Sequence, residues 1–444
     1  MRIENLNLRN YPGMFKSLLF SVLRALSKMI LKKYHPDVVG ITGSMGKSSA
    51  KEAVAQVLRC QFNVRASYKN YNNEVGLPLT IIGAGRTPGR SIFGWLRVFG
   101  RALRLLLVRD PNYPHILVLE MGADKPGDIQ YLVDVAPCKV GVLTSIAHAH
   151  TEFFKTLNKI AQEKRIIISH LRRDGFAILN FDSETVMEQA HVTKAEKVTY
   201  GFRDGADLRA SDMTFIIDDT TGWPSGLNFK VIYKGSIVPV FLPGIVAESF
   251  IPAALAGLAV GSIFGINLVS AAECLRGIKP LPGHMHVLPG IKGTLVIDDT
   301  YNSSPDPVKT ALLTLSKIGV RAGAERYAVL GDMLELGLET HNLHREIGLR
   351  AAELGIDFLI TVGEASKATA AAAREAGLSE HQVASFNNSV EAGRFLQEKM
   401  KEGDVVLVKG SQSMRMERIV KEIMAEPMKA SELLVRQEEE WLKR

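Results

Sequence analysis

Short apolar runs alternate with helical stretches in the first part of the chain. The apolar runs are Val38–Thr42, Ile116–Glu120, Val140–Ser145 and Phe176–Asn180. Strands that alternate with helices are typical of a parallel sheet with helices on its faces. We therefore expect the first part to be an α/β domain.

The pattern changes after this part and then restarts. Residues 195–242 are turn-rich and alternate in polarity, which predicts an antiparallel β region. The alternation resumes after Pro280–Gly283, where we place a domain boundary, and strands are expected at Thr294–Asp298, Tyr327–Leu330, Phe358–Val362 and Val405–Val408. The predicted fold class is α/β, with a central domain on a mostly parallel sheet and a C-terminal Rossmann-like α/β domain. The expected parts are an amphipathic N-terminal arm (1–37), the central domain (38–281), the C-terminal domain (282–428) and a charged helical tail exposed to solvent (429–444).

Two stretches combine helical periodicity with basic residues. In Met14–Leu31 the apolar residues fall on one helical face. In the second stretch one face carries Trp95, Phe99, Ala102, Leu103 and Leu106, and another carries Arg97, Arg101 and Arg104. Basic amphipathic helices suit an anionic membrane surface. The alternatives are that each apolar stripe packs onto the protein's own core, or that the two helices pack together.

A third stretch, Ser249–Ala272, is uncharged and as long as a membrane span. It is rich in Ala and Gly and contains Pro252, so we interpret it as a buried helix followed by a turn.

Charge and cysteine content narrow the function classes. The net charge of +7 comes from two acid-free stretches, Asn5–Pro36 and Arg86–Arg109, each with six basic residues. A nucleic-acid protein more often spreads basic residues over a face with interleaved aromatics, so no nucleic-acid partner is expected. The three cysteines, Cys60, Cys138 and Cys274, lie far apart in the sequence, which predicts no disulfide framework and a reducing, cytoplasmic location.

A glycine-rich loop follows the first apolar run. Gly43-Ser-Met-Gly-Lys-Ser-Ser49 lies between that run and the Ala-rich helical pattern Ala50–Leu58. Backbone N–H groups at a helix N-terminus bind phosphate, a lysine adds positive charge, and the next hydroxyl ligates Mg²⁺. Ile41 stands where the strict phosphate-loop pattern has its first Gly, so a plain glycine-rich turn is the alternative. We expect a P-loop ATPase domain that binds nucleotide through Thr42, Gly43, Ser44, Gly46, Lys47, Ser48 and Ser49.

Several strings, in one order along the chain, resemble the Mur ligase family. They are Ile41–Glu52 with the phosphate loop, Asn70–Pro78, Glu120–Ala123, Ala149-His150, Asp298–Asn302, Gly331–Gly337 and Val408–Met414. The last three resemble the D-alanyl-D-alanine-adding branch. The family consists of ATP-dependent amide-forming ligases of bacterial cell-wall synthesis. The resemblance spans about Val38 to Ile423.

The resemblance implies a mechanism and site residues. The γ-phosphoryl group of ATP passes to a carboxylate, and an amine attacks the acyl phosphate. Lys47, His150 and Lys164 are then catalytic, Ser48 and Glu120 hold one Mg²⁺, and His150 with a carbamylated Lys164 holds a second. Asp299 and Asn302 are expected to contact the nucleotide, and the substrate residues are Asn72, Asn73, Asp332, Glu335, Lys409 and Ser411.

For some of these residues a purely structural or surface role is the alternative to a role in catalysis or metal binding. Glu120 could be a surface acid, His150 a structural histidine, and Lys164 a solvent-facing helix lysine. His344 also matches the family pattern, although a role on a helix surface is equally compatible with its position.

Four features depart from the family. Only 37 residues precede Val38, where the family has a domain that grips the UDP-sugar, and an amphipathic basic arm stands there. The other departures are Gly244–Phe250, Pro282-Gly-His284 and Lys409-Gly-Ser-Gln412. We therefore expect a ligase that joins a peptide-carboxylate acceptor to an amino acid or dipeptide, D-alanyl-D-alanine being favoured. A lipid-linked acceptor would place the protein peripherally at the inner face of an anionic membrane. The alternatives are a ligase for another acid and amine, and a nucleotide-binding scaffold without catalysis.

Overall fold

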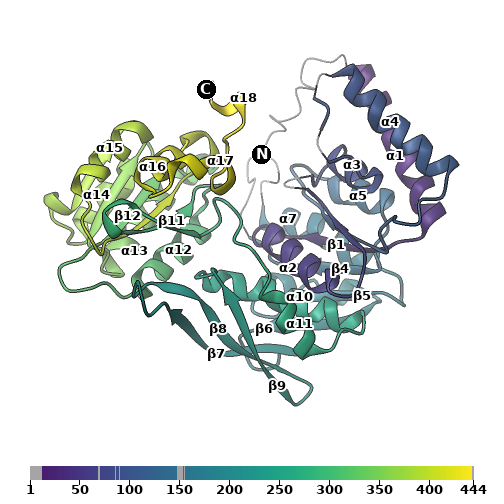
Figure 1. Ribbon diagram of the computed structural model, residues 1–444, viewed down its shortest axis with the longest axis horizontal. Helices are drawn as coiled ribbons and strands as arrows, with labels where there is room; N and C mark the ends of the chain where they lie inside the picture. Colours follow the sequence, from purple (N-terminus) through teal and green to yellow (C-terminus); the bar gives the residue numbers. More distant parts are fainter. Residues whose placement is uncertain are drawn as a thin grey trace. The chain divides into compact units, whose positions relative to one another are not determined.

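The computed structural model describes residues 13–68, 71–85, 87–89, 91–147, 154 and 156–442. These form two compact units (Figure 1). The first unit contains the chain up to Met213, with Phe229–Phe241 and Phe250–Ile278. The second unit contains Thr214–Asn228, Leu242–Ser249 and the chain from Lys279 onward.

The first sheet runs in the order β2-β3-β1-β4-β5-β6-β7-β8-β9. Its neighbours from β2 to β6 pair in parallel, which confirms the predicted mostly parallel sheet. The strands are β1 (Asp37–Thr42), β2 (Val64–Ala66), β3 (Ile116–Glu120), β4 (Val140–Leu143), β5 (Phe176–Asn180), β6 (Glu196–Gly201), β7 (Leu208–Ile217), β8 (Pro224–Tyr233) and β9 (Ser236–Pro243).

The predicted antiparallel region is only partly correct. β6 lies within it but pairs in parallel with β5, and β7 pairs in parallel with β6, so both extend the main parallel sheet. β8 and β9 are joined by Lys234 and Gly235, both with positive φ (48° and 78°), which is the backbone of a tight antiparallel hairpin turn. The hairpin connection therefore begins later than the sequence pattern suggested.

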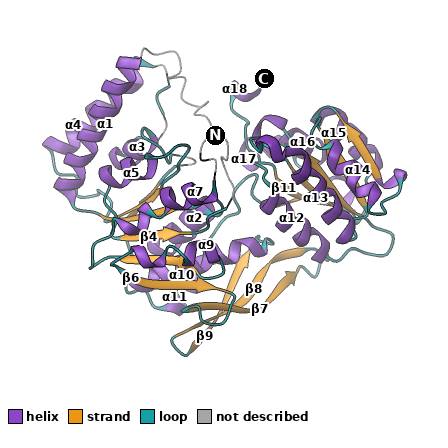
Figure 2. Cartoon of the chain, turned by 180° about the vertical axis from the view of Figure 1, so that it is seen from behind, coloured by secondary structure: helices purple, strands orange, loops and turns teal. Residues whose placement is uncertain are grey.

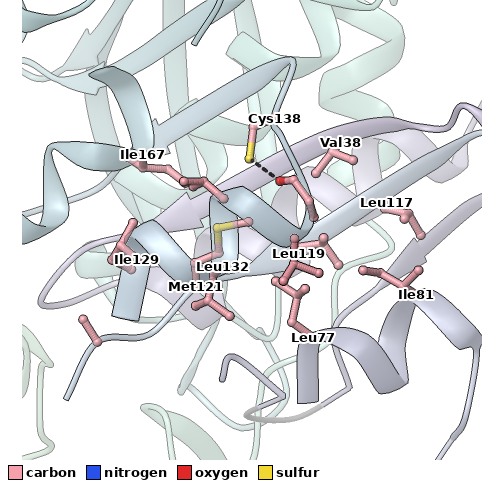
Figure 3. Packing of buried hydrophobic residues seen from close by; sticks show 14 of the residues in the cluster. Val38, Leu77, Ile81, Leu117, Leu119, Met121, Ile129, Leu132, Cys138 and Ile167 are labelled. Carbon is pink, nitrogen blue, oxygen red and sulfur yellow. Dashed lines mark hydrogen bonds between the residues drawn. The ribbon is translucent and has the colours of Figure 1, made fainter. Parts of the chain in front are cut away.

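Helices cover the first sheet and bury its apolar side chains. Figure 3 shows one such layer, where Leu117 and Leu119 of β3 meet Leu77 and Ile81 of α3. Ile129 and Leu132 of α5 join the same cluster. The helices are α1 (Gly13–Tyr34), α2 (Lys47–Arg59), α3 (Gly76–Ile82), α4 (Ile92–Leu107), α5 (Asp128–Val135), α7 (Leu157–Lys164), α8 (Ile166–Ser169), α9 (Glu184–Met187), α10 (Ile251–Ile263) and α11 (Leu268–Leu275).

The uncharged run Ser249–Ala272 forms the buried helix α10, which packs against α2, and then a turn into α11. This confirms the interpretation as a buried helix. Over the described residues, no helix combines the length and apolar character that crossing a membrane requires.

Both predicted basic helices are present, as α1 and α4, and they lie side by side (Figures 1 and 2). The Lys33 ammonium donates to the carbonyls of Leu105 and Leu106, at 2.9 Å each, and so ties α1 to the end of α4. One apolar stripe of each helix is buried in the core, as the packing alternative predicted. Leu103 was expected on the same face of α4 as Trp95 and Ala102, but its side chain is 54% exposed whereas those two are buried.

The expectation of no disulfide is wrong. Cys60, which closes α2, is bonded to Cys274 of α11, although 214 residues separate them in the sequence. Sequence distance did not reveal that α2, α10 and α11 pack together. The cysteine spacing therefore no longer supports a reducing compartment, and Cys138 is the free, buried cysteine.

The second unit is built on a sheet in the order β10-β11-β15-β12-β13-β14. β10 is antiparallel to β11 and the other pairs are parallel. The four predicted strands are confirmed to within one residue at each end. The strands are β10 (His286–Pro289), β11 (Leu295–Asp299), β12 (Arg326–Gly331), β13 (Phe358–Val362), β14 (Val383–Phe386) and β15 (Val405–Lys409). The helices are α12 (Pro305–Lys317), α13 (Thr340–Glu353), α14 (Lys367–Glu375), α15 (Ser389–Lys399), α16 (Glu417–Ile423), α17 (Ala430–Leu433) and α18 (Glu439–Leu442).

The prediction of a solvent-exposed helical tail at 429–444 is wrong for its described part. Residues up to Leu442 form only the short helices α17 and α18, and Leu434, Arg436 and Trp441 are buried. The tail therefore packs back onto the second unit.

Candidate active site

The glycine-rich loop connects β1 to α2 in the first unit. Gly46 has φ 76° at the start of α2, and Gly43 has φ +155°, both outside the range that other residues adopt easily. A Cβ on Gly43 would also clash with the Thr144 hydroxyl. The Ser44 N–H donates to the Ser145 carbonyl at 2.8 Å, so the loop is anchored beside the end of β4.

The ends of three parallel strands surround this loop. β1 lies between β3 and β4, and it ends at Thr42, whose hydroxyl donates to the Met121 carbonyl at 2.7 Å. Ligands of open α/β sheets bind outside the carboxyl ends of the strands. The loop also begins a helix, whose N-terminal N–H groups favour an anion. This edge therefore has the backbone geometry that suits a phosphate group.

Glu120, the last residue of β3, is buried beside the loop. Its carboxylate accepts from the Ser48 hydroxyl at 3.0 Å and from the Asn72 amide at 3.1 Å. Only 2% of its surface is exposed, so the alternative of a surface acid is wrong. The Lys51 ammonium lies 3.7 Å from the same carboxylate and is equally buried.

Sequence reasoning missed Lys51. It follows Lys47 by four residues and therefore lies on the same side of α2. A lysine in an otherwise Ala- and Val-rich buried face was the available signal.

Two lysine side chains converge on one carbonyl of the loop. The ammonium groups of Lys47 and Lys164 donate to the Gly43 carbonyl at 2.7 Å and 3.0 Å. Burial lowers the pKa of Lys47. Lys164 is buried at the end of α7, so the solvent-facing alternative is wrong. Burial and the nearby Lys47 charge lower the pKa of Lys164 to about 7, so a large share is a neutral amine at neutral pH.

Asn73 and Glu163, which adjoin Asn72 and Lys164 in the sequence, bind backbone N–H groups at the starts of two helices. The Asn73 side-chain oxygen accepts from the N–H groups of Val75 and Gly76, at 3.2 Å and 2.9 Å, and so shapes the start of α3. Glu163 accepts from the N–H groups of Gly127 and Ile129, at 2.8 Å and 2.7 Å, at the start of α5. Asn72 therefore points to Glu120, whereas Asn73 holds a turn.

His150 lies outside the described residues. Within the described ranges, no group of three or more His, Cys, Asp or Glu side chains could by itself hold a metal ion. The Ser48 hydroxyl and the Glu120 carboxylate are nevertheless adjacent hard oxygen donors beside a phosphate loop. Mg²⁺ commonly takes one or two protein oxygens and completes its shell with phosphate and water, so this pair fits Mg²⁺.

The candidate residues of the second unit also lie at strand ends. Asp299 ends β11 and Lys409 ends the adjacent strand β15, and their side chains form an ion pair at 2.7 Å. The Lys409 ammonium also donates to the Asn302 carbonyl at 3.0 Å. The structure thus brings Asp299, Asn302 and Lys409 together.

A second group forms the turn after β12. The Asp332 carboxylate accepts from the Ser366 N–H at 2.7 Å, and the Ser411 hydroxyl accepts from the Leu334 N–H at 2.9 Å. Glu335 is exposed in this turn and has φ 63°, a strained conformation for this residue.

His344 stabilises that turn through a hydrogen bond to its backbone. Its Nε2 accepts from the Met333 N–H at 3.0 Å and its Nδ1 lies 2.7 Å from the Thr340 carbonyl, which together assign a neutral ring protonated on Nδ1. Burial lowers its pKa, in keeping with a neutral ring. His344 is 1% exposed, so the helix-surface role is wrong and the residue is a buried support.

The described tail holds the segment that follows β11. Glu417 is buried between Arg415 and Arg436, with N–O distances of 2.5 Å and 2.9 Å. Arg436 also donates to the carbonyls of Thr300 and Tyr301, just before Asn302. We call Arg415, Glu417 and Arg436 the tail clamp. It fixes the backbone beside Asp299 and was not anticipated from the sequence.

The positions at which the sequence differs from the family pattern make contacts within the second unit. His284 stacks on Tyr301, with ring centroids 4.4 Å apart. Glu248, in the Gly244–Phe250 string, forms an ion pair with Lys317 at 2.7 Å. Gln412 begins a short 3₁₀ helix, Gln412–Met414.

Two family domains match the chain. The Mur ligase middle domain matches residues 102–259, and the Mur ligase, glutamate ligase domain matches residues 283–412. The glycine-rich loop lies before the first match, so its assignment rests on the geometry described above.

Full-length relatives cover both units. The chain is 29% identical over 409 residues to the UDP-N-acetylmuramoyl-tripeptide–D-alanyl-D-alanine ligase of Bacillus subtilis, which covers 92% of this chain and 80% of the relative. It is 30% identical over 398 residues to the ligase of the same name from Escherichia coli, with coverages of 89% and 78%. The MurF ligase structure from Thermotoga maritima in complex with ADP is similar with a TM-score of 0.74 at 27% identity, covering 91% of this chain and 83% of that one. The chain therefore belongs to the Mur ligase family.

Proposed function

We propose that this protein is an ATP-dependent ligase that activates a peptide carboxylate as an acyl phosphate and joins it to D-alanyl-D-alanine. The observation that carries the proposal is the first-unit site, where Lys47 and Lys164 meet at the phosphate loop beside Ser48 and Glu120. The similarity to two curated ligases named for this reaction supports the substrate pair. The proposed acceptor is accordingly a UDP-muramoyl-tripeptide of peptidoglycan synthesis.

The reaction has two balanced steps. A carboxylate oxygen of the acceptor attacks the γ-phosphorus of ATP, the bond to the β–γ bridging oxygen breaks, and ADP leaves. The amine nitrogen of the dipeptide then attacks the acyl carbon and loses a proton, while phosphate leaves with the former carboxylate oxygen. Phosphoryl transfer is mostly positioning and charge neutralisation, which a lysine-rich loop supplies.

The residues of the first unit divide this work. The loop N–H groups and Lys47 hold the phosphates. When ATP binds, the Lys47 ammonium turns from the Gly43 carbonyl to a phosphate oxygen, and so exchanges a neutral hydrogen-bond acceptor for a charged one. Ser48 and Glu120 would hold Mg²⁺, which neutralises phosphate charge. Asn72 and Lys51 keep the Glu120 carboxylate oriented. Asn73 remains a proposed substrate residue, and its proposed role is to shape the turn at the start of α3.

Lys164 and His150 are the proposed ligands for a second Mg²⁺ near the acceptor carboxylate. Only a neutral lysine amine reacts with CO₂ to form a carbamate, so the lowered pKa of Lys164 supports carbamylation. The carbamate would replace a buried cation beside Lys47 by an anionic oxygen donor.

The strand-end residues of the second unit have proposed binding roles. Asp299 and Asn302 would contact the nucleotide, while Asp332, Glu335, Lys409 and Ser411 would face the dipeptide or the reacting carboxylate. The Asp299–Lys409 ion pair and the tail clamp support these roles, because they hold the groups in place.

We place the reaction in the cytoplasm, peripherally at the inner face of the membrane. The domain limits that the sequence suggested, 1–37, 38–281, 282–428 and 429–444, are kept as a proposal. The partners are the acceptor, the dipeptide and an anionic membrane surface.

The test measures ADP release from the purified protein with ATP and Mg²⁺. UDP-muramoyl-tripeptide and D-alanyl-D-alanine are added separately and together, and other acids and amines form a second panel. The proposal predicts ADP release only when both substrates are present, with a new peptide product of matching amount, and its loss in Lys47→Ala. Activity only with another acid and amine would establish the alternative ligase. ATP binding without turnover on any pair would favour the scaffold.

A further inference from the structure

The helices α1 and α4 each present a second apolar stripe that the core does not cover. On α1 the exposed residues are Leu18, Val22 and Met29, and on α4 they are Ile92, Phe93, Leu96, Leu103 and Leu107. The α4 side chains are 54–84% exposed. Most are spaced by three, four or seven residues, so each set follows one side of its helix. We call these eight residues the outer stripe.

The outer stripe is distinct from the side chains that hold the helices to the protein. The buried stripe contains Leu19, Leu23, Ile30, Trp95, Val98, Ala102 and Leu105. Because these residues already attach α1 and α4 to the core, the exposed positions are not needed for folding. Single exposed apolar residues are ordinary, but two adjacent helices with a stripe each mark an interaction site.

The charges carried by α1 and α4 themselves have one sign. Lys28 and Lys32 on α1 and Arg97 and Arg104 on α4 are exposed, and neither helix contains an acidic residue. Among the other described basic side chains of these helices, Arg24 lies 3.8 Å from Asp134, and Lys33 and Arg101 donate to backbone carbonyls of the unit. The described side chains of the two helices therefore offer an apolar surface with positive charge and no acid of their own.

We propose that the α1–α4 face binds the surface of an anionic lipid bilayer. Apolar side chains of an interfacial helix enter the boundary between headgroups and acyl chains, and flanking Lys and Arg contact anionic headgroups. Protein interfaces, by contrast, are depleted in lysine and have a polar rim. The absence of acid from both helices removes the repulsion that anionic lipid would otherwise meet. This inference deepens the proposed peripheral location, and it does not depend on the ligation chemistry.

Membrane binding would determine which acceptors the protein meets. A protein held by α1 and α4 works within reach of the bilayer, so a muramoyl-peptide attached to lipid would be accessible to it in addition to the UDP-linked acceptor proposed above. Binding by charge and insertion, without a spanning helix, is reversible and falls with ionic strength.

The test is flotation of the full chain with vesicles. Vesicles of phosphatidylcholine alone are compared with vesicles containing phosphatidylglycerol, at low and high salt. Leu96→Glu with Leu103→Glu adds charge to the outer stripe, and Arg97→Gln with Arg104→Gln removes flanking charge. The matched control is Ile237→Glu, since Ile237 is an exposed apolar residue of β9, 63% accessible and away from these helices.

The proposal predicts flotation with the anionic vesicles only, weakened by salt. The double glutamate variant should bind the anionic vesicles at least tenfold more weakly. The arginine variant should bind them about fivefold more weakly for each charge removed, and Ile237→Glu should bind as the natural protein does. Ligation of soluble substrates should be unchanged in every variant, so failure here is distinguishable from failure of the proposed reaction. Absent flotation, or equal flotation of the double glutamate variant, overturns the proposal. A lipid-independent dimer that the same variant dissociates would also overturn it and identify a second copy as the occupant.

Discussion

The lowered pKa of Lys164 predicts a pH-dependent cost to the stability of the first unit. In the folded chain the ammonium is buried beside Lys47 and has a pKa of about 7, whereas an unfolded lysine titrates near 10.4. Below pH 7 both states are protonated, so the folded state carries the full cost of the buried charge. Between pH 7 and about 10.4 the unfolded state binds more protons, and stability rises with pH.

The perturbation is Lys164→Met, which keeps a long side chain and removes the titrating group. A shift of this size corresponds to about 5 kcal/mol at full effect, at about 1.4 kcal/mol for each pKa unit. From pH 6.5 to pH 8.5, the stability of the natural protein should rise by about 2 kcal/mol relative to the variant. Lys159→Met is the matched control, because Lys159 lies on α7 as well but is exposed.

The assay is hydrogen–deuterium exchange of peptides that cover β1 and β4, which reports unfolding of the first unit. It is performed in CO₂-free buffer, so that carbamylation does not contribute. If the stability difference between the natural protein and Lys164→Met changes by less than about 0.5 kcal/mol over this range, roughly a quarter of the expected change, the buried Lys164 does not titrate as stated. A parallel measurement with ¹³C-labelled bicarbonate should show a protein carbamate signal that Lys164→Met lacks.

Three further changes test the site and its support. Lys47→Ala should lower ADP release by roughly 10²–10³-fold, because the developing phosphate charge loses its nearest cation; retention within tenfold would contradict this role. Gly43→Ala should weaken ATP binding at least tenfold by calorimetry, because the added Cβ meets Thr144 at a positive φ; an unchanged Kd would exclude the loop as the phosphate site. Arg436→Gln should destabilise the second unit by about 3 kcal/mol, because Glu417 loses a buried partner. Thermal melting measures this loss, with exposed Arg394→Gln as control, and equal melting of the two variants would argue against the tail clamp.

The strands that hold the site were predictable because they are continuous apolar runs. β3, β5 and β13 have the predicted limits, since a strand buried on both faces needs apolar residues at every position. The phosphate loop was predictable for a related reason, because its glycines and lysine are contiguous. β2 and β14 were missed, since three or four residues give too short a pattern.

The remaining features depend on contacts between distant residues. Arg436 meets Thr300 across 136 positions, and Cys60 meets Cys274 across 214. The periodicity of a charged tail indicates an exposed helix, whereas the buried Glu417 partner of Arg436 and the buried side chains of Leu434 and Trp441 account for its packing. The same limit applies to Lys164, because a helix lysine shows its burial only when its neighbours are known.

The central claim is that ATP makes an acceptor carboxylate reactive toward an amine. The direct measurement uses an acceptor with ¹⁸O in both carboxylate oxygens, together with D-alanyl-D-alanine, ATP and Mg²⁺, and mass analysis of the released phosphate. Each released phosphate should carry one ¹⁸O, and the new amide should carry the other. Phosphate that carries oxygen only from ATP and water, or turnover that leaves the acceptor unjoined, would contradict it.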